Sequence, residues 1–363
     1  MGDNGDGALF CDQQPEPTPG SRSRKGLRPP LSPARRGVSP EPVLVGVLAL
    51  VWVLFSIKSP VFRTPQNYLD IATLIAEPGL VALAMTLIII TGGIDLSVGS
   101  IVALSAVTLG LAWQSQLFSI WSAVAAGVLV GVLSGTLNGG LIVFFRIPPL
   151  IVTLATMAIL RGIAMGTSHG LAVSQYDPAF YTLGQGCYSI AGLKVPFQAV
   201  VLAGAAVVSF VFLSRTRWGR YLYAIGMNET ASRYAALPVD RVKLCVYALS
   251  GLMSGLASAV FVSRVATAKA DAGLYMELDA ITACVLGGVS IYGGRGSIPG
   301  TLLGLLIVGS LRRGLDLSRV VASTQSIYIG AVLILAVFAH QVLVPALQNR
   351  ALRPSLRRGD AES

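Results

Sequence analysis

Long uncharged apolar stretches alternate with short polar segments along most of the chain. A helix needs about 20 apolar residues to cross a bilayer, and several of the stretches reach that length. The pattern therefore predicts an all-α, polytopic membrane protein with about ten transmembrane helices. They are expected at residues 43–57, 69–91, 95–113, 118–145, 149–167, 197–214, 243–263, 279–292, 297–311 and 321–344.

The eighth and ninth of these stretches are short, and the segment "GGRGS" separates them, so a re-entrant hairpin is an alternative there. "GGIDLSVGS" in the first half has an echo in "GGRGSIPG" in the second, which suggests two inverted repeats with broken helices, as many transporters have. Small residues at every fourth position also predict closely packed membrane helices. These residues are Gly127, Gly131, Gly135 and Gly139, and later Gly296, Gly300 and Gly304.

The segment "TGGIDLSVGS" at residues 91–100 interrupts two uncharged apolar runs. Gly92 and Gly93 are expected to end one helix and to give the backbone freedom to turn. Asp95 follows two residues later, and an ionised carboxylate at this position is costly unless it has a partner or a function. We therefore treat the segment as a candidate helix break on the transport path.

Asp95 is predicted to cap the helix that begins near Leu96. The first N–H groups of a helix have no partner within it, and in a bilayer no water replaces them. An Asp side chain accepts from the N–H two or three residues on, which here belongs to Ser97 or Val98. Direct participation of Asp95 in the substrate path or in a proton relay is the alternative.

Three other polar residues within apolar stretches are candidates. Glu77 precedes Pro78, and a kink there would turn the carboxylate toward a cavity, unless the side chain extends outward to the membrane surface. Asn138 lies on the first glycine ridge and would either contact a polyol or link helices. Arg161 is expected to extend its guanidinium to the interface at the end of its span.

Composition supports a membrane protein, because 53% of the 363 residues are hydrophobic, only 12% are charged, and the mean hydropathy is +0.70. The net charge of +10 lies mainly in three clusters, in residues 22–36, 215–243 and 350–358. Clusters between spans are typical of cytoplasmic segments, so both termini are predicted to be cytoplasmic. A nucleic-acid surface is the weaker interpretation. Arg312 and Arg313 do not fit this orientation, because a count of ten spans places them on the non-cytoplasmic side of the membrane.

The chain is divided into a disordered, basic, Pro-rich cytoplasmic tail (1–41), a transmembrane domain (42–346) and a second cytoplasmic tail (347–363). Four cysteines and two histidines form no metal-ligand pattern, and no phosphate-binding loop or nucleophile pair is present in the sequence. We therefore predict no cofactor, no metal and no enzymatic activity in this chain.

The segment 215–242 is predicted to be a cytoplasmic loop with a structure of its own. Asn228 is placed as the N-cap of a helix over 229–236, and Pro238 takes Leu237 out of helical geometry. A short helix on the charged side of the membrane suits docking of a soluble partner. An interfacial helix lying on anionic lipid is the alternative.

Several blocks resemble the membrane subunits of bacterial ribose-type ABC importers. They cover residues 43–344 in order, and their sequences are most similar to those of rhamnose and autoinducer-2 permeases. The blocks are "AMTLIIITGGIDLSVGS" (84–100), "GTLNGGLI" (135–142), "PLIVTLATMAILRGIA" (149–164), "TRWGRYLYAIGMNETASR" (216–233) and "ELDAITACVLGGVSIYGGRGSIPGTLLG" (277–304).

The resemblance implies a permease of the bacterial inner membrane that forms a sugar path. The implied partners are a second permease, two ATP-binding subunits that hydrolyse ATP, and a periplasmic sugar-binding protein. Residues matching the family's coupling helix are Gly226, Asn228, Glu229 and Ala231. The sequence departs from the family at 236–238, where "ALP" replaces a Gly-Ile pair.

Two other transport classes remain open. A branched-chain amino acid permease is a relative of the same importer class, and it would differ in the ligand of its binding protein. An ion-coupled secondary transporter would need an intramembrane carboxylate, for which Asp95 or Glu77 is available.

Overall fold

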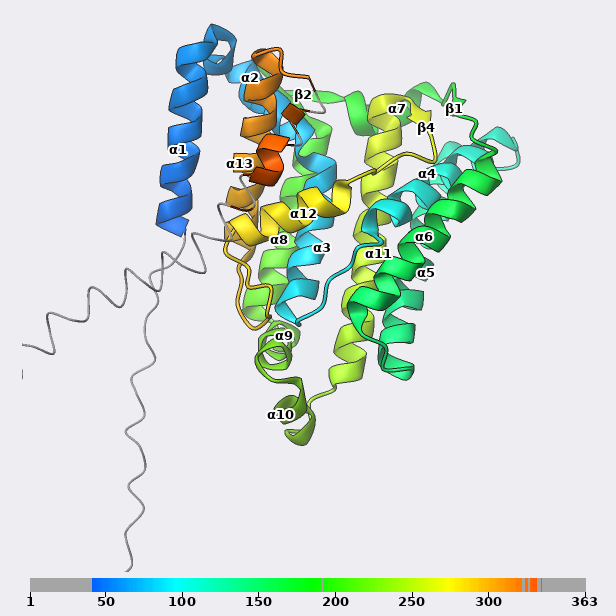
Figure 1. Ribbon diagram of the computed structural model, residues 1–363. Helices are drawn as coiled ribbons and strands as arrows, with labels where there is room; N and C mark the ends of the chain where they lie inside the picture. The colour runs from blue at the N-terminus through cyan, green and yellow to red at the C-terminus, as the bar shows by residue number, and fades with distance from the viewer. Residues whose placement is uncertain (1–40, 191, 322–323, 326, 332–333, 335–363) are drawn as a thin grey trace, which may run out of the picture. The chain divides into compact units, whose positions relative to one another are not determined.

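The computed structural model describes residues 41–190, 192–321, 324–325, 327–331 and 334, and within them the fold is almost entirely helical (Figure 1). The two predicted tails and most of the predicted span 321–344 lie outside these residues. The helices are α1 (Glu41–Lys58), η1 (Pro60–Arg63), α2 (Pro65–Leu74), α3 (Ala76–Ile90), α4 (Val98–Gln114), α5 (Ile120–Phe144), α6 (Pro149–Ser168), α7 (Pro178–Gln185), α8 (Phe197–Arg215), α9 (Arg217–Met227), α10 (Glu229–Tyr234), α11 (Val239–Val265), α12 (Met276–Leu286) and α13 (Ile298–Leu317).

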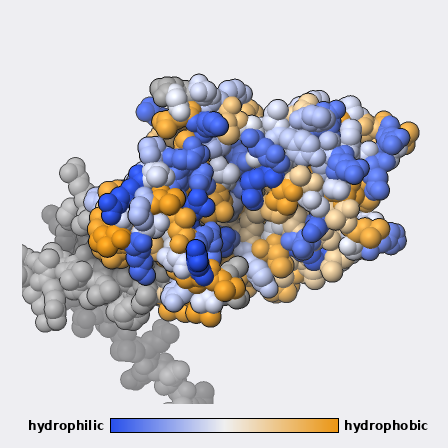
Figure 2. Space-filling view, turned by 90° about the horizontal axis from the view of Figure 1, so that it is seen from above, coloured by the Kyte–Doolittle hydropathy of each residue, from blue (hydrophilic) through white to orange (hydrophobic). Residues whose placement is uncertain are grey.

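Two small antiparallel pairs of strands accompany the helices in the described residues. β1 (Val173–Ser174) pairs with β4 (Thr267–Ala268), and β2 (Cys187–Ile190) pairs with β3 (Leu193–Pro196). Both lie at the end of the bundle opposite α10 (Figure 1). Figure 2 views the bundle from this end and shows hydrophilic residues spread among apolar ones.

Each of the first nine predicted spans contains a helix. In the described residues, six helices are long and apolar enough to cross a membrane, or seven if α2 and α3, which meet at a bend of 54°, are counted as one span. α4, with 17 residues, is shorter than these candidate spans, and α12, with 11 residues, is too short for a full crossing. The predicted eighth span, 279–292, is therefore a short helix that ends at Leu286.

The helices form two sets with the same order and opposite direction. In the first set α3 is followed by the non-helical segment 91–97, the short helix α4 and the long helix α5. In the second, α11 is followed by 266–275, the short helix α12 and the long helix α13. Figure 1 shows α3 running toward the α9–α10 end and α11 running away from it. The echo between "GGIDLS" and "GGRGS" was therefore misleading, because the counterpart of 91–97 is 266–275.

Three glycines of the first ridge, Gly131, Gly135 and Gly139, form the seam between α5 and α11, whereas Gly127 packs on α4 at Ser105. A Cβ on Gly131 would lie 2.5 Å from the carbonyl oxygen of Gly251, and one on Gly139 would lie 3.1 Å from the Cα of Leu244. The two backbones can approach this closely only because the ridge carries no side chains. On α13, Gly304 packs in the same way on α12, at Ala283.

Arg312 and Arg313 lie on α13 away from the α9–α10 end, and each has an acidic partner. Arg312 donates to Asp279 of α12 at 2.6 Å, and Arg313 donates to Asp70 of α2 at 2.6 Å. Both arginines are therefore held within the bundle by carboxylates of other helices.

Candidate functional site

The end of the bundle that carries α9 and α10 has more helix than the sequence predicted. The hydroxyl of Thr216 caps α9 by accepting from the N–H of Gly219 at 3.2 Å, and Leu222 and Ile225 are buried under the helix. We predicted only one short helix within 215–242. The signal we missed was a capping threonine followed by apolar residues at helical spacing.

The predicted capping residue of the next helix, α10, is confirmed. The side chain of Asn228 accepts from the N–H of Ala231 at 2.9 Å. The helix ends at Tyr234, two residues earlier than predicted, and Ala236 has a positive φ of 58°. Glycine adopts this left-handed conformation without strain, whereas the Cβ of Ala236 makes it costly.

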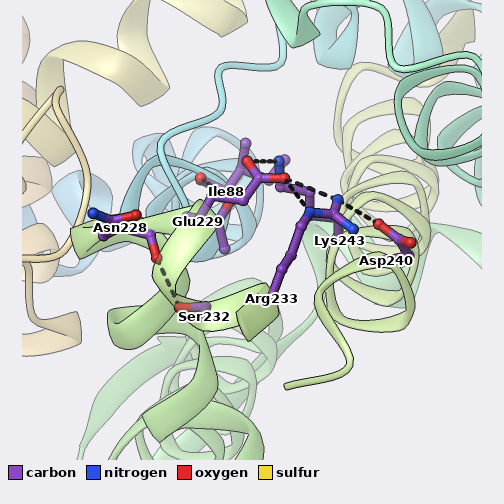
Figure 3. Close-up of polar contacts among 8 residues, drawn as sticks. Ile88, Asn228, Glu229, Ser232, Arg233, Asp240 and Lys243 are labelled. Atoms are coloured by element: carbon purple, nitrogen blue, oxygen red, sulfur yellow. Dashed lines mark hydrogen bonds and ion pairs between the residues drawn. The ribbon is translucent and has the colours of Figure 1, made fainter. Parts of the chain in front are cut away.

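Ion pairs fix α10 to the first turns of α11 (Figure 3). Glu229 accepts from Lys243 at 2.6 Å and from Arg233 at 3.0 Å, and Arg233 also donates to Asp240 at 2.6 Å. Partial burial alone would raise the pKa of Glu229, but the hydrogen bonds and charges of Lys243 and Arg233 outweigh it and hold the pKa below its ordinary value.

A cleft of about 390 Å³ opens between this ion-pair group and the connection from α5 to α6. It is lined by Ile142, Val143, Arg146, Ile147, Pro148, Pro149, Glu229, Arg233, Asp240 and Lys243. Apolar and charged side chains therefore meet at one concave surface beside α10.

Gly226, at the end of α9, is packed against two other segments. A Cβ there would lie 2.5 Å from the backbone nitrogen of Gly294 and closer still to the carbonyl oxygen of Ile90. The N–H of Gly294 donates to that same carbonyl at 2.9 Å, and the hydroxyl of Tyr223 donates to the carbonyl of Gly296 at 2.7 Å. We call this meeting point of α9, the end of α3 and the loop 287–297 the glycine junction.

The chain leaves the glycine junction through the predicted helix break. Gly92 has a φ of +82°, and three residues later Asp95 is completely buried. Asp95 accepts from the N–H of Ser97 at 3.0 Å and from its hydroxyl at 2.6 Å, while the hydroxyl of Ser250 on α11 donates at 3.0 Å. The carboxylate thus holds the broken backbone to the middle of α11.

The bond to the N–H of Ser97 is the one expected from the sequence, but Asp95 is not the cap residue. α4 begins at Val98 rather than near Leu96, and its N-cap is Ser97. The pairing with Ser250 could not be predicted, because it joins residues 155 positions apart.

Asn138 belongs to the same group as Asp95, whereas Glu77 does not. The amide nitrogen of Asn138 donates to the hydroxyl of Ser97 at 2.7 Å, which links α5 to the break. Gly93 lies close to the hydroxyl of Tyr247, because a Cβ there would be 2.7 Å from it. The amide oxygen of Asn138 and the hydroxyl of Tyr247 are buried without a hydrogen-bond partner in the described residues.

Glu77 neither faces a cavity nor extends to the membrane surface. Its side chain is 1% exposed and accepts from Arg264 of α11 at 2.6 Å. The bend that we attributed to Pro78 lies earlier, between Leu74 and Ala76. Arg161 also does not reach the interface; its guanidinium donates to two carbonyls within the bundle.

Comparison with known proteins gives the family. The profile described as "Branched-chain amino acid transport system / permease component" matches residues 67–337. The chain belongs to this permease family. It is a multi-pass membrane protein and a transport subunit, which agrees with the apolar helices described above.

Members named for the import of ribose, autoinducer 2 and L-arabinose are similar over most of their length. The ribose import permease of Bacillus subtilis (strain 168) is 42% identical over 295 residues, covering 81% of this chain and 90% of that protein. An autoinducer 2 import permease of Photorhabdus laumondii is 34% identical, covering 87% and 94%, and an L-arabinose permease of Azospirillum brasilense is 37% identical, covering 82% and 86%. Sequence identity therefore does not single out the autoinducer-2 permeases, which the motifs in the sequence had suggested.

Proposed function

We propose that this chain is the permease subunit of an ATP-binding cassette importer for a monosaccharide or a similar small polyol. In this proposal a periplasmic binding protein delivers the solute, and a second permease completes the path through the inner membrane. Separate subunits bind and hydrolyse ATP. The similarity to permeases named for ribose, arabinose and autoinducer 2 supports the solute class.

The observation that carries the proposal is the connection from α10 through the glycine junction to the helix break. α10 projects at one end of the bundle; its last residue, Tyr234, is 89% exposed, and Met227, just before the helix, is 78% exposed. Exposed large side chains on a fixed helix suit a protein partner, since Tyr is enriched at interface hot spots. We infer that α10 docks on the ATP-binding subunit and that the adjacent cleft receives part of that subunit.

The glycine junction gives a physical route for transmission. A displacement of α10 moves α9, which contacts the end of α3 at Ile90 and the loop before α13 at Gly294. Ile90 leads directly into the break that Asp95 holds to α11. Both sets of helices are therefore reached from the same docking element.

The orientation follows from this docking role. We propose that the α9–α10 end and both termini face the cytoplasm and that residues 168–190 and 192–196, at the other end, face the periplasm. Fusions to a reporter enzyme that works only in the periplasm are expected to be inactive at residue 20 and after residue 350, and active within 168–194. The opposite result at either terminus would contradict the orientation.

A crosslinking experiment tests the function. A cysteine introduced by Tyr234→Cys should crosslink to a co-expressed ATP-binding subunit. Leu171→Cys, which is 70% exposed at the opposite end, is the control and should not crosslink. Ala231→Pro removes the N–H that Asn228 caps and should uncouple ATP hydrolysis from uptake. Normal uptake by this variant would reduce α10 to an interfacial anchor.

The purified chain alone is expected to show no ATP hydrolysis above background, because the proposal assigns hydrolysis to another subunit. A branched-chain amino acid permease would be recognised by the ligand of its binding protein. A secondary transporter would need uptake driven by an ion gradient. Of the two carboxylates that such a transporter could use, Glu77 is paired with Arg264.

A further inference from the structure

The break between α11 and α12, residues 266–275, begins with β4 at the end of the bundle opposite α10 and runs inward to the start of α12 (Figure 1). Arg161, near the centre of α6, donates to the carbonyls of Ala270 and Ala272 at 2.7 and 2.9 Å. α12, which follows the break, crosses the centre of α3, where the thiol of Cys284 donates to the carbonyl of Ala82 at 3.3 Å. The break therefore enters the bundle from the strand end, and its last residues, 270–275, lie beside α6 and lead into α12 within the bundle.

The start of α4 meets this break. Gly273 has a φ of +67°, and a Cβ there would lie 2.9 Å from the carbonyl oxygen of Gly99. Gly99 in turn has no room for a side chain, because the carboxylate of Glu277 and the carbonyl of Gly273 occupy that space. The first turns of the two short helices thus pack against each other, and this contact fixes the backbone of the break.

One face of the break is exposed. Leu274 and Tyr275 are 55% and 60% exposed, and Asp271 is exposed as well. Tyr275 has a φ of +65°, so its backbone is not helical at this point. Irregular backbone and ionisable side chains at membrane depth do not face lipid; they line a water-filled cavity or contact protein.

The outer face of α6 is a useful contrast at comparable depth. Ile159 is 57% exposed, about as much as Tyr275, but it belongs to a regular helix whose exposed neighbours are apolar. Such a surface satisfies its backbone hydrogen bonds internally and can face lipid. The exposed face at 271–275 differs from this surface of α6, because its backbone is not helical and it carries the Asp271 carboxylate and the Tyr275 hydroxyl.

We propose that the exposed face of residues 271–275 lines the aqueous passage, and that Asp271 and Tyr275 contact the sugar there. The carboxylate accepts hydrogen bonds from sugar hydroxyls, and the aromatic ring covers the apolar C–H face of the sugar ring. Arg161 is the positioning residue, since it holds the two carbonyls that flank Asp271. The ligand class rests on the proposed function; the water-lined surface rests on the fold alone.

Accessibility to a charged thiol reagent tests the surface. In the assembled transporter, with the native cysteines replaced, Leu274→Cys and Tyr275→Cys should react with a membrane-impermeant sulfonate reagent in vesicles of either orientation. Ile159→Cys should react only with a lipophilic maleimide. If both cysteines in the break behave like the Ile159 control, the surface does not line water and the proposal is wrong.

Protection and transport measurements test the sugar contact. Ribose and arabinose, presented by the binding protein during turnover, should slow the labelling of Leu274→Cys. Asp271→Asn should raise the KM for uptake by about tenfold, the effect of losing one hydrogen bond to a charged group, while ATP hydrolysis stays stimulated. Unchanged KM in both Asp271→Asn and Tyr275→Ala would overturn the sugar contact.

The outcomes separate this inference from the proposed function. If the solute is not a sugar, the cysteines remain accessible to the charged reagent but neither sugar protects them. If the chain is a sugar permease with its path elsewhere, uptake persists and the break remains closed to the charged reagent.

Discussion

Replacing Gly226 with alanine would test the route from α10 into the membrane. The added Cβ would lie 2.5 Å from the nitrogen of Gly294, and real Cβ contacts shorter than 3.0 Å are essentially absent. α9 must therefore move away from Gly294 by at least about 0.5 Å. The contact with the carbonyl of Ile90 is shorter still and requires a larger movement. Both opposing groups are backbone, so no side chain can rotate to make room.

Overpacking of this kind destabilises a protein by about 1–3 kcal/mol, and the rigid backbone on both sides places Gly226→Ala in the upper half of that range. The movement also strains the hydrogen bond from Gly294 to Ile90. We expect a lower unfolding temperature and, in complexes that still assemble, weaker coupling of ATP hydrolysis to uptake.

The assay compares unfolding in detergent with ATP-driven uptake in proteoliposomes that contain all subunits. Gly204→Ala on α8 is the matched control, since nothing lies within 4 Å of a Cβ at that position. Alanine there should leave uptake unchanged and raise helix stability slightly. If Gly226→Ala unfolds and transports as the control does, the glycine junction is not a rigid contact and the route is refuted.

Three further predictions concern the break and α10. Asp95→Asn keeps an acceptor oxygen and should retain assembly and substantial uptake. Asp95→Leu leaves the N–H of Ser97 and two hydroxyls without their acceptor and should lose folded complex. If Asp95→Asn assembled but did not transport, the charge itself would be needed. Ala236→Gly should raise the unfolding free energy by up to about 1 kcal/mol, measured by thermal unfolding, because it relieves a positive φ. Because the pKa of Glu229 in the folded protein lies below its ordinary value of 4.5, its ion pairs stabilise α10 fully at pH values above 4.5. This stabilisation is lost as the pH falls through the lower pKa of the folded protein, so Glu229→Gln should remove the acid-dependent step in unfolding.

The helical class, the membrane location and the approximate helix positions were determined by the sequence. Backbone groups must be satisfied within each segment in a bilayer, so an apolar run of sufficient length has few alternatives to a helix. The cap at Asn228 and the acceptor role of Asp95 toward Ser97 were predictable for a related reason. Both are local interactions between residues two or three positions apart.

Only the tertiary structure decided the lengths of α4 and α12, the pairing of Arg312 with Asp279 and the partners of Arg161. Each depends on residues that are distant in the sequence, and composition does not reveal which carboxylate or carbonyl a buried arginine reaches. The position of the break at 266–275 is the clearest case. No polar motif marks it as a counterpart of 91–97, and its position follows from the packing of α6, α3 and α4 around it.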